Sequence, residues 1–238
     1  MPIGAVVLGI MTTLHPGSLT VGDVPPSHES TSTPSNSSSP RIQLADFGTH
    51  RVSPDARYLA HWTAASGDHL GMQFVIVDKN AARVHVFDPA SRLIASSPVL
   101  LGSARGDDSV PDIGSRPIAD VRPEERTTPA GRFIAERGRN LSGEDVIWVD
   151  YDNAVSMHRV RTTNPMERRL QRLATPTIDD NRISYGCINV PIAFYEAYIR
   201  PIFANHRAVV YVLPEVKTVQ QVFAAYGLTA PHRLAAKQ

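Results

Sequence analysis

The feature that most constrains this chain is a succession of short apolar segments, each long enough for one strand and bounded by turn residues. In the second of them, Val84 and Val86 alternate with His85 and Phe87, which is the two-residue period of a strand. Strands are expected in segments 73–78, 83–88, 93–101, 145–150, 154–160 and 208–213. Helical segments do not alternate regularly with them, so β–α–β units are not indicated. The pattern predicts a mainly β core.

Four segments have the spacing or the end signals of helices and are expected at the periphery. They are 54–66, 166–173, 191–205 and 218–226. Ser53 and Gly67 suit the two ends of the first helix, as an N-cap and a left-handed C-terminal residue. In the third helix, Phe194, Tyr198 and Ile202 are expected to be buried, and Ile199 is left open.

Length and composition suit one domain with appendages. Of the 238 residues, 42% are apolar and 20% are charged, which is enough for a sizeable core. Segment 3–11 is apolar but too short to span a bilayer, and segment 25–40 is rich in Ser and Pro. We therefore expect a signal-like segment and disordered linker over 1–40, no stable membrane span, and a folded domain over 41–238 with its core at about 70–215.

Charge and cysteine content limit the classes of partner. The formal net charge is +1, which gives no electrostatic reason to expect nucleic acid. A single cysteine excludes an intrachain disulfide. The scattered histidines form no ligand motif, so neither a metal nor a cofactor is expected, and the oligomeric state is left open.

The single cysteine lies in the hexapeptide Ser184-Tyr185-Gly186-Cys187-Ile188-Asn189. A cysteine acts as a nucleophile through its thiolate, and backbone N–H groups in a tight turn can stabilise negative charge. Gly186 would allow the backbone to approach closely. The alternative is a buried structural cysteine, the commoner fate of a free thiol.

A second motif lies upstream, Thr128-Pro129-Ala130-Gly131-Arg132-Phe133, and would by itself be an ordinary turn entering a strand. Together, the two motifs resemble the hallmarks of L,D-transpeptidases, cysteine enzymes that remodel peptidoglycan stem peptides. Tyr185 stands where that family usually has His. The resemblance implies a β-sandwich-like catalytic domain with peripheral helices.

A cysteine nucleophile needs a base, and the chain has nine histidines. His85 and His158 fall in expected strands, which would hold a base rigidly. His158 also takes the place of the family's histidine, upstream of the cysteine, although Arg159 follows it where the family has Gly. The resemblance therefore implies His158 as the base, and His85 is interpreted as structural.

The resemblance implies acyl transfer through a thioester on Cys187. Backbone N–H groups around Tyr185, Gly186 and Cys187 would bind the oxyanion, while Ser184 and Asn189 would hold the cysteine turn. The expected partners are peptidoglycan stem peptides, and the expected location is extracytoplasmic, either periplasmic or associated with the cell wall. Two alternatives remain: an L,D-carboxypeptidase or amidase that cuts a related amide, and a noncatalytic wall-binding module.

An insertion relative to the family, at about 161–182, separates His158 from the cysteine motif. Most charged runs only solvate a surface. Beside this site, however, arginines could bind the carboxylates of stem peptides through paired hydrogen bonds. The candidate substrate-binding residues are Arg159, Arg168, Arg169 and Arg172.

Overall fold

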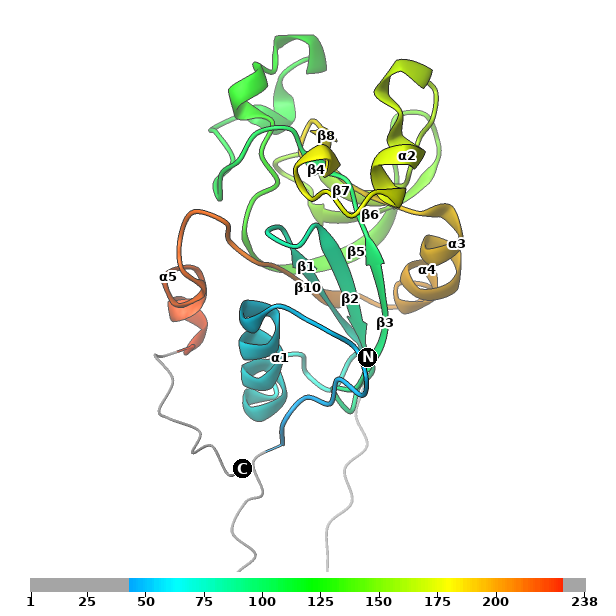
Figure 1. Cartoon of the computed structure of the whole chain (residues 1–238). Coiled ribbons are helices and arrows are strands. Elements are labelled where there is room, and N and C mark those ends of the chain that lie inside the picture. The colour runs from blue at the N-terminus through cyan, green and yellow to red at the C-terminus, as the bar shows by residue number, and fades with distance from the viewer. Residues whose placement is uncertain (1–42, 229–238) are drawn as a thin grey trace, which may run out of the picture. The chain divides into compact units, whose positions relative to one another are not determined.

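A computed structural model describes residues 43–228, and the segment predicted to be a signal and linker, 1–40, lies outside them. The core of the described chain is one eight-stranded sheet in the order β3-β2-β1-β10-β5-β6-β7-β9 (Figure 1). The bounds of these strands are β1 Phe74–Asp78, β2 Arg83–Phe87, β3 Leu93–Pro98, β5 Gly131–Arg139, β6 Asp145–Asp150, β7 Val155–Arg159, β9 Ile188–Val190 and β10 Ala208–Val212. The mainly β prediction with peripheral helices is confirmed.

The sheet bends until its two edges nearly meet. After β3, Leu100 and Asn189 exchange backbone hydrogen bonds of 2.9 and 2.8 Å, which link the first edge strand to the last. Two short strands continue this seam, because β4 (Leu101–Gly102) pairs in parallel with β8 (Arg182–Ser184). The segment predicted as one strand over 93–101 is therefore divided, and it divides just after Pro98, which has no N–H to donate to a ladder.

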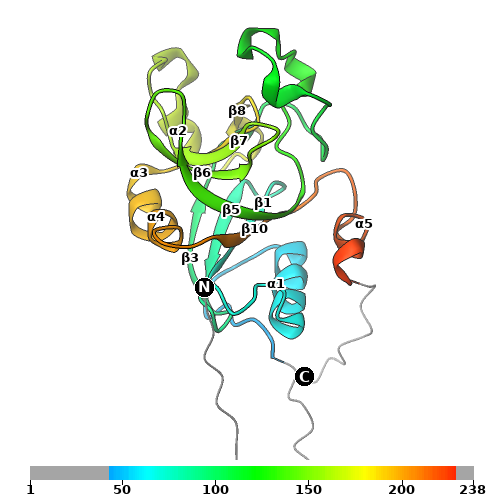
Figure 2. The same cartoon turned by 180° about the vertical axis from the view of Figure 1, so that it is seen from behind.

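Alternating side chains divide the apolar residues between the two faces of the sheet. Val75 and Val77 of β1 point into the core enclosed by the sheet, whereas Phe74 and Ile76 point to the other face. That other face is covered by α1 (Pro54–Ser66) and α5 (Val219–Phe223), which lie on the same side in Figures 1 and 2. Both faces of the central strands are therefore buried.

Both helices that cover the sheet begin at the predicted caps, and α1 also ends as predicted, whereas α5 ends at Phe223 and not near Tyr226. The Ser53 hydroxyl accepts from the Ala56 N–H at 3.0 Å, and Gly67 ends α1 in the left-handed conformation. At the start of α5, Thr218 and Gln221 each accept from the other's backbone N–H, which is a capping box. A 3-10 turn, Ala224–Tyr226, then leads to Gly227 at φ +87°.

The helix predicted over 191–205 is shorter and irregular. It consists of α3 (Ile192–Phe194), a π-helical turn (Tyr195–Ile199) and α4 (Arg200–Ile202). Pro201 cannot donate to the preceding turn, and its ring excludes regular α-helical packing there. Ile202 is buried as predicted, whereas Tyr198 is 39% exposed and Tyr195 is buried instead. Within residues 43–228, this helix and the others are too short or too polar to cross a membrane.

Two irregular segments rise at one end of the sheet, on either side of β4, β7 and β8 (Figures 1 and 2). The first joins β4 to β5 and contains 3-10 turns at Ile113–Ser115, Ile118–Asp120 and Pro123–Glu125. The second is the insertion, with 3-10 turns at Pro165–Glu167 and Asp179–Asn181 and the short helix α2 (Arg169–Ala174). The helix expected over 166–173 is interrupted at Arg168, which has φ +51°.

Candidate active site

Parallel pairing of β7 with β9 brings the two main candidate residues together. Val155 and Met157 of β7 point into the enclosed core, so Ser156 and His158 lie on the opposite face. His158 pairs in register with Asn189, and Met157 pairs with Ile188. Continuing this register by one residue places Cys187 opposite Ser156, on the same face as His158.

Cys187 is half-buried and has polar neighbours around its sulfur. The Sγ atom lies 3.6 Å from Ser156 Oγ and 3.7 Å from the Ala154 carbonyl oxygen. Burial tends to raise the pKa of the thiol, but a hydrogen bond from His158, its charge, and the Ser156 N–H and hydroxyl together hold that pKa below its ordinary value. The site therefore favours the nucleophilic thiolate.

His158 is held in one orientation by its own strand. Its Nδ1 lies 2.8 Å from the Arg159 carbonyl oxygen, and because a carbonyl only accepts, Nδ1 carries the proton. Nε2 is then the nitrogen able to accept a proton from a thiol. A cavity of about 420 Å³ borders His158. Most of its charged lining comes from Arg139, Glu144, Asp145, Arg159 and Arg161.

The cysteine turn is fixed through the Cys187 carbonyl. The Ser184 hydroxyl donates to this oxygen at 2.6 Å, and the Asn189 side-chain amide donates to it at 3.3 Å. Ser184 Oγ also accepts from the Gly186 N–H at 3.1 Å. Because the Gly186 N–H is already engaged, the backbone donors left for an oxyanion in this turn are those of Tyr185 and Cys187.

Gly186 meets a requirement that no other residue satisfies easily. Its φ is +127°, and a Cβ placed there would lie 2.7 Å from the Thr127 carbonyl oxygen. The contact places the Thr-Pro-Ala-Gly segment directly against the cysteine turn, since the Thr128 hydroxyl also donates to the Gly186 carbonyl at 2.8 Å. The two sequence motifs are thus neighbours in space.

Tyr185 has a cationic neighbour. The guanidinium carbon of Arg126 lies 4.0 Å from the centre of its ring, and the tyrosine is 40% exposed. The aromatic ring therefore forms part of the accessible surface beside the cysteine.

The candidate arginines differ in how the fold uses them. Arg159 pairs with Asp145 and Glu196, and its guanidinium packs over the Tyr195 ring. Arg169 forms an ion pair with Glu167 and donates a hydrogen bond to Asn189 Oδ1 at 2.6 Å. Arg172 donates to the carbonyl oxygens of Glu167 and Asp180, each at 2.7 Å. Arg168 is exposed and borders a smaller cavity of about 150 Å³.

His85 lies in β2, where it pairs in register with Ile76 of β1 and Ser96 of β3. It is buried, and burial together with the charge of Arg83 lowers its pKa to about 4. Its Nδ1 lies 2.7 Å from Ser96 Oγ. These contacts give His85 a place in the packing of the sheet.

Two residues next to the cysteine turn are not among the sequence candidates. Ser156 has a sequence signal, because it lies two positions before His158 and so shares its strand face. Thr128 stands out in the sequence only as the first residue of a motif. Its hydroxyl becomes significant once the register of the sheet places it against Gly186.

No protein-family model matches the sequence, and no curated protein matches it. Solved L,D-transpeptidases are among the structures it resembles. The catalytic domain from E. faecium is 16% identical, with 61% of this chain and 99% of that one covered and a TM-score of 0.34. The Mycobacterium smegmatis L,D-transpeptidase is 13% identical, with 59% of this chain and 58% of that one covered and a TM-score of 0.33.

Pgp2, the helical cell shape determining protein of Campylobacter jejuni, is 14% identical, with 62% of this chain covered and a TM-score of 0.40. The match covers about half of Pgp2, 49% of its length. Similarity at this level is low, and the functional proposal therefore rests on the site itself.

Proposed function

We propose that this protein is an extracytoplasmic cysteine acyltransferase of the L,D-transpeptidase type, acting on peptidoglycan stem peptides. The observation that carries the proposal is the geometry around Cys187: its sulfur lies 3.6 Å from Ser156 Oγ, on the sheet face that His158 shares, and these two residues lower the pKa of the thiol. Such a lowered pKa at a half-buried, accessible thiol is typical of a nucleophile and unusual for a structural cysteine. Cell-wall biogenesis and cell shape are the processes it would serve.

The reaction begins with thiolate attack on an amide carbonyl of a donor tetrapeptide, after a diaminopimelate-type third residue. The Cys187 sulfur forms a bond to the carbonyl carbon, and the carbonyl π electrons move to oxygen. The N–H groups of Tyr185 and Cys187 donate to this oxyanion. As the C–N bond breaks, the protonated His158 gives the Nε2 proton to the departing D-alanine amine, leaving a thioester on Cys187.

An acceptor amine then attacks the thioester carbon. Neutral His158 takes a proton from the attacking nitrogen, the C–S bond breaks, and the thiolate is restored. With a second stem peptide as acceptor, the product is a 3→3 cross-link. Water in place of the amine would give a shortened peptide, which is the product of the hydrolase alternative.

The test is mass spectrometry of muropeptides after incubation with the purified protein, with and without an added amine acceptor. We expect a cross-linked or amine-linked product together with released D-alanine. Shortened peptide alone, whatever the acceptor concentration, would favour the hydrolase. Unchanged muropeptides with an intact, unreactive thiol would favour the noncatalytic wall-binding module.

A further inference from the structure

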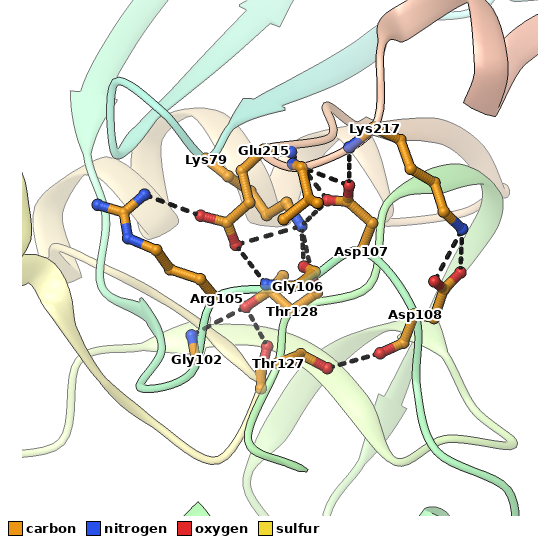
Figure 3. A network of polar contacts seen from close by, with 12 residues as sticks. Lys79, Gly102, Arg105, Gly106, Asp107, Asp108, Thr127, Thr128, Glu215 and Lys217 are labelled. Carbon is orange, nitrogen blue, oxygen red and sulfur yellow. Dashed lines mark hydrogen bonds and ion pairs between the residues drawn. The ribbon is translucent and has the colours of Figure 1, made fainter. Parts of the chain in front are cut away.

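A buried ammonium group lies beneath the segment that contacts the cysteine turn. Lys79, just after β1, is fully buried. Its Nζ donates to Asp107 Oδ1 and to the Thr128 carbonyl oxygen, each at 2.8 Å, and to the Gly106 carbonyl at 2.5 Å (Figure 3). Every proton of the ammonium group therefore has a hydrogen-bond acceptor within the fold.

The same cluster ties together segments that are far apart in the sequence. Asp107 accepts from the backbone N–H groups of residues 215–217, and Glu215 lies 3.5 Å from Lys79 (Figure 3). Glu215 also pairs with Arg182. Moving such charges from water into the protein interior is costly, and apolar residues of similar size in their place often stabilise a fold equally well or better. A network of this kind is better explained by the geometry that it imposes.

The geometry that it imposes is that of Thr128. Lys79 holds the Thr128 carbonyl, while the Thr128 hydroxyl accepts from the Gly102 N–H at 2.9 Å and donates to the Gly186 carbonyl at 2.8 Å. The residue is thus fixed through both its main chain and its side chain. Because Thr128 is fully buried, its hydroxyl has no solvent to which it could turn instead.

The carbonyl that Thr128 holds belongs to the peptide unit between Gly186 and Cys187. In a planar trans peptide, the C=O and the N–H point in opposite directions. Fixing the Gly186 C=O on the Thr128 side therefore turns the Cys187 N–H to the other side. A glycine turn at φ +127° could otherwise rotate this peptide unit with little steric cost.

We propose that Thr128, locked in place by Lys79, is a positioning residue that aims the Cys187 N–H at the developing oxyanion. This inference rests on the proposed acyl transfer, because only a reaction through an oxyanion uses that donor. The Thr-Pro-Ala-Gly motif thereby has a physical role, since Thr128 orients the nucleophile's own peptide bond without touching the substrate.

The test compares two reactions of the same thiol. Acylation by p-nitrophenyl acetate passes through an oxyanion, whereas alkylation by iodoacetamide displaces iodide and needs no oxyanion donor. Both rates are measured by intact-protein mass spectrometry for the wild type, Thr128→Val and Thr128→Ser. Val keeps the branched shape of Thr and removes the hydroxyl, and Ser keeps the hydroxyl.

We expect Thr128→Val to lower the ratio of acylation rate to alkylation rate by about tenfold or more, since an oxyanion donor contributes about 10²–10³-fold and here it is misaligned and not removed. Thr128→Ser should keep the ratio within about threefold of the wild type, because it retains the hydroxyl. Lys79→Met should lower the ratio in the same direction if it folds. The Thr128 pair tests the proposal even if it does not.

The inference would be overturned if Thr128→Val left the ratio of acylation rate to alkylation rate unchanged, or lowered both rates equally. It would also be overturned if Thr128→Ser lowered this ratio as much as Thr128→Val does. So would a wild-type thiol that the ester does not acylate. Failure of the proposed function looks different: stem peptides are not turned over by the wild type, while the ester-to-iodoacetamide ratio still depends on the Thr128 hydroxyl.

Discussion

Ser156 Oγ and Cys187 Sγ lie 3.6 Å apart, on adjacent parallel segments whose register places the two residues opposite each other. The hydroxyl and the backbone N–H of Ser156 both contribute to lowering the pKa of the thiol. The activation of the cysteine therefore depends on strand pairing, in addition to the histidine two residues further along β7.

We predict that Ser156→Ala slows acylation of Cys187 by about tenfold to a hundredfold, which corresponds to one hydrogen bond to a charged group. The pKa of the thiol should rise, because the hydroxyl is lost while the backbone N–H remains. The measurement is the rate of iodoacetamide alkylation as a function of pH. Ser97→Ala, at another buried strand serine, is the matched control and should leave the profile unchanged.

We predict that His158→Gln slows acylation by about a hundredfold or more, since it removes the proposed general base. The pH profile of alkylation shows in which direction the substitution shifts the pKa of the Cys187 thiol. A pKa below the ordinary 9.0 places the wild-type midpoint below pH 9.0, and loss of the His158 interaction moves the midpoint upward. His85→Gln is the control. A larger effect of His85→Gln, with the fold preserved, would show that the base is wrongly assigned.

We predict that Gly186→Ala is more damaging than Gly143→Ala. Both glycines have positive φ, +127° and +77°, but a Cβ at Gly143 meets open space, whereas one at Gly186 meets the Thr127 carbonyl oxygen. Denaturant unfolding should give a loss of about 1 kcal/mol for Gly143→Ala and about 2 kcal/mol or more for Gly186→Ala. Equal losses in the free energy of unfolding would contradict the close approach at the cysteine turn.

The elements that the sequence predicts well are those with local causes. Both ends of α1 are specified by residues at or next to them, namely Ser53, Pro54 and Gly67. The strand predicted over 145–150 has the observed bounds. The irregular helix after β9 has a local cause as well, since Pro201 is visible in the sequence. Its effect on which aromatic residues are buried depends on the π-helical turn that precedes it.

The parts that could not be predicted depend on pairing between distant segments. Strand β9 is only Ile188–Val190, and it is a strand because β7 and the Leu100 segment flank it. Ser156 gains its position from the same register, and Thr128 from its contact with Gly186. The sequence predicts that Cys187 acts with His158 only through the family resemblance, because no local pattern joins the two residues.

We predict that Arg168 and Arg172 of the insertion have separable effects. Arg172→Gln loses two hydrogen bonds to main-chain carbonyls and should lower the Tm by about 2–4 °C. Arg168→Gln should leave the Tm within about 1 °C and raise KM for a carboxylate-bearing tetrapeptide, if this exposed side chain binds substrate. Unchanged kcat/KM in Arg168→Gln would mean that it only solvates the surface.

The central claim is that Cys187 carries the acyl group. Intact-protein mass spectrometry after brief exposure to a tetrapeptide donor tests it most directly, with Cys187→Ala as the matched variant and circular dichroism to check its fold. We expect a thioester adduct on the wild type that disappears when an amine acceptor is added, and neither adduct nor product from Cys187→Ala. Turnover by Cys187→Ala at the wild-type level would contradict it.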